Sequence, residues 1–173
     1  MTEHNRRRAL QQGLGLGLGM ALFGAASARA EAAPLPRTVQ WPAQVTLLDG
    51  RTLGAAALNA QPALVVFWST TCPFCRRHNE HVEKLQRAAV GTRLLVLGVA
   101  VDGDRDKVLE HARRQGYSFP ITLDSKALGA TFDTRRVIPR TYAVEAGSRL
   151  VSAAAGEMFE EDVMEYLQLA RPA

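Results

Sequence analysis

The chain has 173 residues, of which 47% are hydrophobic and two are cysteines, and its formal net charge is +4. Residues 1–30 hold four of the 21 basic and one of the 17 acidic side chains, so the other 143 residues carry a net charge of only +1. A nearly neutral chain gives no reason to expect nucleic-acid binding. The remaining length is enough for one domain with a hydrophobic core. Two cysteines three residues apart close too short a loop to stabilise such a domain as a disulfide scaffold.

The N-terminal segment has the pattern of an export signal. The arginines from Arg6 to Arg8 precede a weakly apolar stretch from Leu14 to Ala26, and Ala28-Arg29-Ala30 supplies an AxA cleavage site. We therefore expect residues 1–30 to be a signal peptide that is removed from a periplasmic protein. A transmembrane helix needs about 20 apolar residues, so an uncleaved membrane anchor is the less favoured alternative. The paired arginines are typical of the twin-arginine export route, and Sec export is the alternative.

The segment after the cleavage site is expected to lead into a single domain. Residues 31–42 are rich in proline and predict an extended linker. The domain is then expected to span residues 43–173. It begins with an apolar run from Val45 to Leu48, a turn at Asp49-Gly50 and a second extended run from Thr52, which together predict a β-hairpin.

Both cysteines follow directly on an apolar run. Ala63 to Trp68 predicts a buried strand, and Pro73 suits the first position of a helix that should extend to about Ala89. Cys72 then lies at the start of the helix and Cys75 one turn inside it. Residues at this spacing on a helix are close enough to form a disulfide. The sequence therefore predicts a dithiol site where a strand is followed by a helix.

The predicted position of Cys72 favours one chemical role for each cysteine. A helix N-terminus carries partial positive charge and free N–H groups, which stabilise a thiolate. We therefore expect Cys72 to be the nucleophile and Cys75 the resolving thiol. Phe74 lies between them and is expected to be exposed, where it can contact an apolar segment of a substrate. Trp68 is expected to pack beneath the site, and we assign it with Phe74 to the substrate-binding residues.

His78 lies one helical turn beyond Cys75. Its imidazole is a candidate proton acceptor during disulfide exchange near neutral pH. The alternative is a partly exposed helix residue that contacts Glu80 or Glu83.

Two patterns suggest metal binding, and neither meets its requirements. Cys72, Cys75, His78 and His81 have a zinc-like spacing, but along a helix the first and last lie about 13 Å apart, too far for one ion with bonds of about 2.0–2.3 Å. The aspartates at 102, 104 and 106 have the spacing of a calcium loop but lack its glycine and glutamate. We expect no metal and no cofactor.

Strands and helices alternate through the rest of the chain. Arg93 to Val101 is typical of a buried parallel strand, and Asp104 or Asp106 is expected to cap the helix that follows. This alternation, ending in a hairpin, predicts an α/β fold with a mixed β-sheet flanked by helices. The further predicted elements are a helix end near Gly116, a strand around 120–123, a helix over 125–132, a strand over 141–145 headed by Pro139, a strand over 149–154 after the Gly147-Ser148 turn, and a helix over about 160–170.

Four motifs together resemble a known family. FWSTTCPFC, LLVLGVAVD, GYSFPITLD and VIPRTYAV are similar to the TlpA/ResA/CcmG group of exported thiol:disulfide oxidoreductases, over residues 43–170. The resemblance implies a thioredoxin fold with an N-terminal hairpin and a central insertion at about 104–123. It also implies a cis-proline beside the dithiol at Pro139, with Ile138 before it presenting its backbone to a substrate. Pro73 and the Pro-Arg-Thr-Tyr sequence are similar to the cytochrome c maturation branch.

The chain departs from the family pattern at three positions around the dithiol. Thioredoxins have a buried acid where this chain has Val66, and many relatives have tryptophan where it has Thr71. Several reductases of the group have glutamate at the position of His78. The proton acceptor for Cys75 is therefore left open by the sequence.

The resemblance implies a disulfide reductase that acts on protein clients in the periplasm. Electrons would come from a membrane protein of the DsbD/CcdA type, apocytochrome c is one candidate client, and we expect a monomer. The alternatives are a dithiol oxidase of the DsbA kind, which a very low pKa of Cys72 would favour, and a non-enzymatic thioredoxin-fold binding module.

Overall fold

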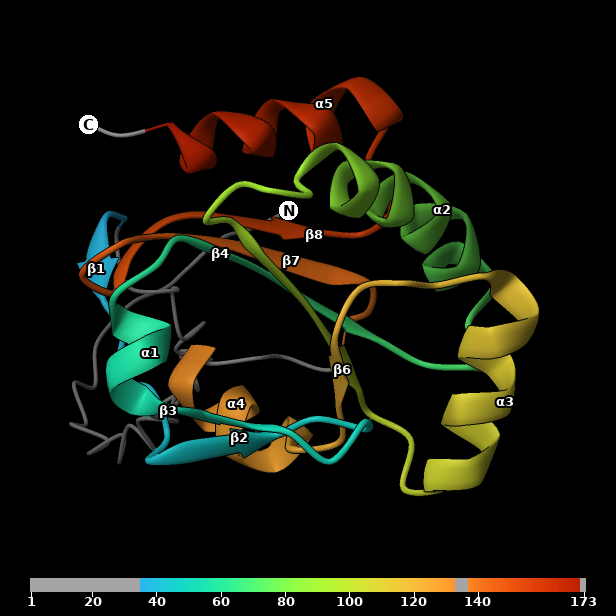
Figure 1. Ribbon diagram of the computed structural model, residues 1–173. Coiled ribbons are helices and arrows are strands. Elements are labelled where there is room, and N and C mark those ends of the chain that lie inside the picture. Colours follow the sequence, from blue (N-terminus) through green and yellow to red (C-terminus); the bar gives the residue numbers. More distant parts are fainter. Residues whose placement is uncertain (1–34, 133–136, 172–173) are drawn as a thin grey trace, which may run out of the picture. The chain divides into compact units, whose positions relative to one another are not determined.

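In the computed structural model, which describes residues 35–132 and 137–171, a six-stranded mixed β-sheet has the strand order β1-β8-β7-β4-β5-β6 (Figure 1). The central strand β4 (Ala63–Trp68) runs parallel to β5 (Leu95–Ala100) and antiparallel to β7 (Arg140–Glu145). Every residue of β4 is buried, as its uninterrupted apolar run predicts. The sheet is completed by β1 (Arg37–Thr38), β6 (Ile121–Thr122) and β8 (Arg149–Ala155).

Helices cover both faces of this sheet. On one face α2 (Pro73–Ala88) packs against α5 (Glu160–Glu165), and on the other lie α1 (Ala55–Asn59) and α4 (Ser125–Phe132) (Figure 1). The mixed sheet flanked by helices confirms the predicted α/β fold, and the boundaries of α2 and β4 agree with those expected from the sequence. The predicted signal peptide, residues 1–30, lies outside the described residues.

The alternation of side chains along β4 divides the hydrophobic core in two. Successive residues of a strand point to opposite faces of the sheet, so Leu64, Val66 and Trp68 join the core beneath α2, and Ala63, Val65 and Phe67 join the core beside α4. β4 ends at Trp68 and α2 begins at Pro73, so the short loop between them contains Cys72.

The central insertion consists of α3 (Arg105–Gln115) and β6, between β5 and α4. Of the two candidate caps for this helix, Asp104 is the one used: its side chain accepts hydrogen bonds from the backbone N–H groups of Asp106 and Lys107. Gly116 ends the helix with a φ of +71°, a left-handed conformation that glycine adopts without strain.

The N-terminal hairpin is present as a separate two-stranded sheet, which an isolated bridge between Leu47 and Thr122 joins to β6. Its strands are β2 (Gln44–Thr46) and β3 (Thr52–Gly54), joined by the predicted Asp49-Gly50 turn. The Leu48 N–H donates to the Ile121 carbonyl at 2.7 Å, and the Thr122 hydroxyl donates to the Thr46 carbonyl at 2.6 Å. These bonds attach the hairpin to the central insertion.

The two ends of the described chain differ from the expected pattern. Within the segment expected to be a linker, β1 pairs with β8, and Val39 is buried. Trp41 packs edge-on against Phe132 with 5.4 Å between the ring centroids, so this segment belongs to the hydrophobic core. At the other end the predicted helix divides into α5 and a 3₁₀ turn over Tyr166–Ala170, a tightening that is common in the last turn of a helix.

Candidate active site

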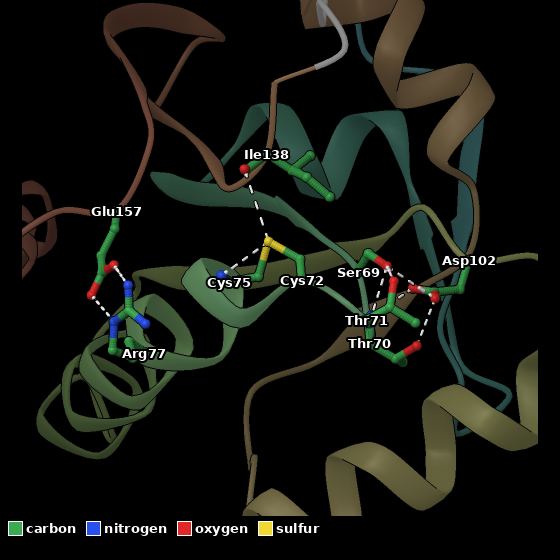
Figure 2. The surroundings of a disulfide bond; sticks show 9 residues. All are labelled: Ser69, Thr70, Thr71, Cys72, Cys75, Arg77, Asp102, Ile138 and Glu157. Carbon is green, nitrogen blue, oxygen red and sulfur yellow. Dashed lines mark hydrogen bonds and ion pairs between the residues drawn. A yellow bond between two sulfur atoms is a disulfide. The ribbon is translucent and has the colours of Figure 1, made fainter.

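The dithiol lies at the N-terminus of α2 and is present as a disulfide (Figure 2). Cys72 is the N-cap residue, with extended backbone dihedrals, and Pro73 occupies the first helical turn. The Cα atoms of Cys72 and Cys75 are 5.2 Å apart. The backbone N–H of Cys75 donates to the Sγ of Cys72 at 3.2 Å. In the reduced protein this N–H and the helix dipole would stabilise a thiolate on Cys72.

Exposure to solvent distinguishes the two sulfur atoms. Cys72 is half-buried, whereas Cys75 is fully buried. The side chain between them, Phe74, is 56% exposed, and the Arg77 guanidinium lies 5.0 Å from the centroid of its ring. An incoming sulfur can therefore reach Cys72 from solvent, beside an exposed aromatic ring, but cannot reach Cys75 in the same way.

The loop that carries Cys72 is held by a carboxylate from the next strand. Asp102 follows β5 and accepts hydrogen bonds from the Thr70 N–H at 3.0 Å, the Thr70 hydroxyl at 2.7 Å and the Ser69 hydroxyl at 3.1 Å. The Ser69 carbonyl in turn accepts from the Cys72 N–H at 3.3 Å. The spacing of Asp102, Asp104 and Asp106 suggested a calcium loop, with helix capping and solvation as the favoured alternative, and neither interpretation predicts this role of Asp102. The signal for it was its place after a central parallel strand, because the ends of β4 and β5 meet at one edge of the sheet.

The loop before β7 lies next to Cys72. The Ile138–Pro139 peptide bond is cis, as the resemblance implies. The carbonyl oxygen of Ile138 faces the Sγ of Cys72 at 4.0 Å (Figure 2). Pro139 is buried and Ile138 half-buried. The structure thus brings two segments together that are 66 residues apart in sequence.

His78 of α2 is fully buried. The backbone N–H of Met158 donates to its Nδ1 at 3.3 Å, so the ring proton is on Nε2, which donates to the Thr141 hydroxyl at 2.9 Å. Burial, with a smaller effect of His81, lowers the pKa of His78 to about 4. With both nitrogens engaged and so low a pKa, His78 is poorly suited to accept a proton at neutral pH. The alternative of a partly exposed residue beside Glu80 or Glu83 is wrong, because the ring is buried.

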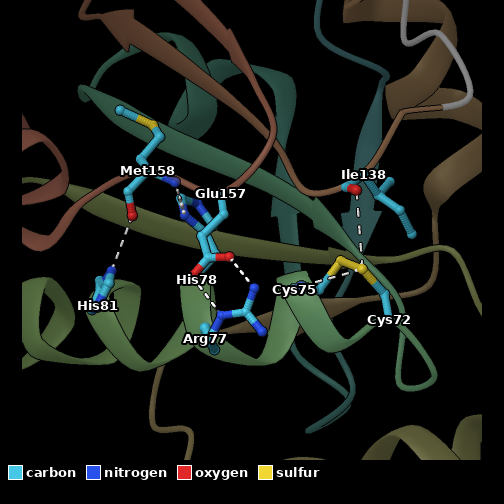
Figure 3. A network of polar contacts seen from close by, with 8 residues as sticks. All are labelled: Cys72, Cys75, Arg77, His78, His81, Ile138, Glu157 and Met158. Carbon is cyan, nitrogen blue, oxygen red and sulfur yellow. Dashed lines mark hydrogen bonds and ion pairs between the residues drawn. A yellow bond between two sulfur atoms is a disulfide. The ribbon is translucent and has the colours of Figure 1, made fainter.

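Further contacts join α2 to the segment before α5 (Figure 3). The Arg77 guanidinium forms a two-point ion pair with the Glu157 carboxylate, at 2.8 and 2.5 Å. His81 contacts the Met158 carbonyl through Nδ1 at 3.1 Å. Among residues 35–132 and 137–171, no cluster of histidine, cysteine or carboxylate side chains could hold a metal ion.

Trp68 lies in the core and not on the accessible surface. It is fully buried, and its ring packs edge-on against Tyr117 at a centroid distance of 5.7 Å. Its assignment as a substrate-binding residue is therefore wrong, because no substrate at the surface can touch it. The other sequence-predicted residues, Cys72, Cys75, Phe74, Ile138 and Pro139, lie around the end of α2.

The sheet order, the helix-capping dithiol and the adjoining proline loop define a thiol-disulfide oxidoreductase of the thioredoxin fold. The family model described as Redoxin matches residues 31–168, and the chain belongs to this family. Membership favours the enzyme over the non-enzymatic binding module.

Named relatives agree with this assignment. The thiol-disulfide oxidoreductase ResA of Halalkalibacterium halodurans is 27% identical over 125 residues, which cover 72% of this chain and 71% of the relative. A thiol:disulfide interchange protein of the thioredoxin family from Chlorobium tepidum has a TM-score of 0.68 and 21% identity, over 78% of this chain and 97% of its own. StoA from Bacillus subtilis has a TM-score of 0.60 and 18% identity, over 79% and 98%. The two solved structures show likeness of fold.

Proposed function

We propose that the protein is a periplasmic reductase that opens disulfides in protein clients. The observation that carries the proposal is the unequal exposure of the two sulfurs, with Cys72 open to solvent beside the Ile138 carbonyl and Cys75 fully buried. A client sulfur can attach to Cys72 alone, and the resolving thiol is protected from other reactions. This asymmetry suits a two-step exchange through a mixed disulfide.

The exchange would begin with the protein in its dithiol form. The Cys72 thiolate attacks one sulfur of the client disulfide, the client S–S bond breaks, and the released client thiolate takes a proton from water. The Cys75 thiol then loses its proton and attacks the Cys72 sulfur. This forms the internal disulfide and releases the second client sulfur, which also becomes a thiol. The client gains two electrons and two protons, and the protein loses them.

The accessible surface around Cys72 suits an extended client segment. A client strand would pair with the backbone at Ile138, so that main-chain hydrogen bonds give affinity without a strict sequence requirement. Phe74, which lies between the two cysteines in the sequence, is exposed and would contact apolar client side chains. We propose these two residues, with Pro139 shaping the loop, as the client-binding site.

The direction of electron flow is tested by the reduction potential of the Cys72–Cys75 couple. The alternative, a dithiol oxidase, gains support from the Cys75 N–H that would stabilise a Cys72 thiolate. A potential near that of thioredoxin, about −270 mV, would support the reductase, and one near about −120 mV would overturn it in favour of the oxidase.

Periplasmic location rests on the signal-peptide pattern of residues 1–30. Among the described residues, none of the helices has the length and apolar character needed to cross a membrane. We propose a membrane protein of the DsbD/CcdA type as electron donor. Pro73 and the sequence at 139–142, which are similar to the cytochrome c maturation branch, support apocytochrome c as a client.

A trapping experiment tests the client class. In Cys75→Ala the mixed disulfide on Cys72 cannot be resolved, so clients should stay attached and can be identified after purification from periplasmic extract. Cys72→Ser is the control, because it retains Cys75 but has no exposed nucleophile. Recovery of apocytochrome c would support the cytochrome role, and equal recovery from both variants would contradict the exchange mechanism.

A further inference from the structure

A second group of buried polar side chains includes Asn79, the residue that follows His78 on α2. We call it the inner polar cluster, and it consists of Trp68, Asn79 and Tyr117. The Trp68 indole N–H, both amide atoms of Asn79 and the Tyr117 hydroxyl are buried, and none has a hydrogen-bond partner within 35–132 and 137–171. Asn79 is fully buried. Unpaired buried polar atoms are rare in folded proteins, and four in one cluster require an explanation.

These side chains are close to one another and to the resolving cysteine. The rings of Trp68 and Tyr117 are 5.7 Å apart. Burial raises the pKa of Tyr117 to about 12, and the Asn79 amide, acting as a hydrogen-bonding group toward the hydroxyl, partly opposes this rise. The amide therefore lies near the hydroxyl, although the geometry of the two groups falls short of a hydrogen bond, and the hydroxyl keeps its proton. Asn79 is four residues after Cys75 on α2, and residues at this spacing lie on the same face of a helix.

The atoms of the inner polar cluster complement water. The indole N–H of Trp68 and the amide nitrogen of Asn79 donate, the amide oxygen accepts, and the Tyr117 hydroxyl does both. A buried water typically makes about three such bonds. We propose that Asn79 and Tyr117 hold an ordered water beside Cys75, and that this site takes the proton from the Cys75 thiol when it attacks the mixed disulfide.

The chemistry of resolution requires a proton acceptor on this side of Cys75. A fully buried thiol is disfavoured as a thiolate, yet only the thiolate attacks. Next to Asn79 on α2, both nitrogens of His78 are engaged, and the Val66 side chain in β4 cannot accept a proton. The proposal rests on the proposed exchange function. In the proposed step the S–H bond of Cys75 breaks, its proton passes through the water to solvent, and its electron pair forms the bond to Cys72.

The surrounding charges leave this route open. Glu83 lies one turn beyond Asn79 on α2, but its carboxylate already accepts from the Ser118 N–H at 2.6 Å, the Ser118 hydroxyl at 2.8 Å and Arg87 at 2.8 Å. His111 of α3 is buried, with its ring 5.9 Å from Tyr117 and 5.6 Å from Trp68. The other charged groups that act on Tyr117 are Arg76 and Glu80. Those that act on His111 are Arg76, Asp102 and Arg114. Those that act on the neighbouring His78 are His81 and Glu157.

The kinetic test measures resolution alone, with glutathione as the group on Cys72. The reduced protein is mixed with glutathione disulfide, and formation of the Cys72–Cys75 bond is followed in single turnovers against pH, in H₂O and D₂O. Tyr117→Phe and Asn79→Leu remove the polar atoms and keep apolar volume. We expect resolution at pH 7 to slow by at least about tenfold and its pH profile to move upward. Phe119→Leu is the control, because Phe119 stacks on Tyr117 at 5.0 Å but has no polar atom, and its pH profile should be unchanged.

A crystal structure of the full chain at high resolution gives an independent readout. Water bonded to Asn79 and Tyr117 would support the proposal, and a direct bond between these side chains with no water would overturn it. Unchanged pH profiles in Tyr117→Phe and Asn79→Leu would also overturn it. Because glutathione replaces the client, a protein that resolves glutathione normally but fails to reduce protein disulfides would contradict the proposed function and leave this inference intact.

Discussion

At the scale of single residues, the site depends on polar side chains whose partners are distant in sequence. His78 bonds to Thr141, 63 residues away, and Asp102 bonds to Thr70, 32 residues away. The bond to Thr141 fixes the orientation of the His78 ring, and the bond to Asp102 fixes the backbone of Thr70. These two residues therefore allow direct tests of how the site is maintained.

The lowered pKa of His78 predicts a loss of stability in acid. An unfolded histidine has a pKa of 6.5, and that of folded His78 is about 4, so between these values the unfolded chain binds a proton that the folded protein does not. The free energy of unfolding should therefore fall as the pH falls through this window, by about 3 kcal/mol from this group. Urea unfolding at pH 7.5 and pH 4 measures the fall, and His78→Gln should show a correspondingly smaller one. An imidazole signal from His78 that titrates near pH 6.5 would contradict the assignment.

The carboxylate of Asp102 should control the conformation of the loop before Cys72. Asp102→Asn replaces an acceptor of three hydrogen bonds by an amide whose NH₂ group would face donors. Hydrogen bonds to charged groups contribute about 1.5–3 kcal/mol each, so we expect lower stability and a several-fold fall in kcat/KM for insulin reduction. Asp106→Asn is the matched control, since that side chain is 94% exposed and does not contact the loop. Equal effects of both changes would contradict a role for Asp102 in positioning Cys72.

At the scale of elements, α2 is the helix that presents the dithiol, and its position depends on burial of one face. Val82, Leu85 and the C-cap residue Ala89 are buried against the sheet, as the spacing of apolar residues predicts. The opposite face is charged, and ion pairs such as Arg77 with Glu157 link it to the segment before α5. Exposed ion pairs contribute little to stability, so the apolar face should dominate.

A pair of identical substitutions tests this division. Val82→Ala removes two methyl groups from a fully buried side chain, whereas Val90→Ala removes the same groups just beyond the helix, where the residue is 75% exposed. We expect the first change to lower the free energy of unfolding by about 2 kcal/mol and the second by less than about 0.5 kcal/mol. Thermal or urea unfolding measures both, and losses of similar size would show that α2 is not held by its apolar face.

At the scale of the whole molecule, the core includes residues before the predicted domain boundary. Val39 is buried, β1 pairs with β8, and Trp41 contacts Phe132. A chain that starts at residue 43 should therefore be less stable than one that starts at residue 31, by about 2 kcal/mol or more, because it loses a buried side chain and an aromatic contact. Urea unfolding of the two chains measures this difference in the free energy of unfolding. Equal values would contradict a structural role for the segment before residue 43.

The close approach of β5 to the central insertion also depends on the fold of the whole domain. A Cβ on Gly98 would lie 2.6 Å from the Phe119 ring and 3.0 Å from the Trp68 indole nitrogen. The apolar run around this glycine predicts a buried strand, but nothing in it indicates which aromatic side chains approach the backbone there.

The features that depend on near neighbours could be predicted from the sequence. The helix start at Pro73, the buried strand before it and the end of α3 at Gly116 follow from the preferences of adjacent residues and from the period of the apolar side chains. For the start of α3 the same preferences left two candidate caps, Asp104 and Asp106. The roles expected for Cys72 and Cys75 come from the same local pattern, and the burial of the two residues agrees with these roles.

The surroundings of each side chain could not be predicted in this way, because they depend on how the chain folds. Spacing along α2 places His78 and Asn79 one turn beyond Cys75. Folding pairs His78 with Thr141 and Met158, and it leaves the Asn79 amide without a hydrogen bond in the part of the chain that the structure describes. Folding likewise buries Trp68 and joins the segment around Val39 to the core. Polar partners and burial depend on residues brought together from distant parts of the chain, and this information is not present in the local pattern.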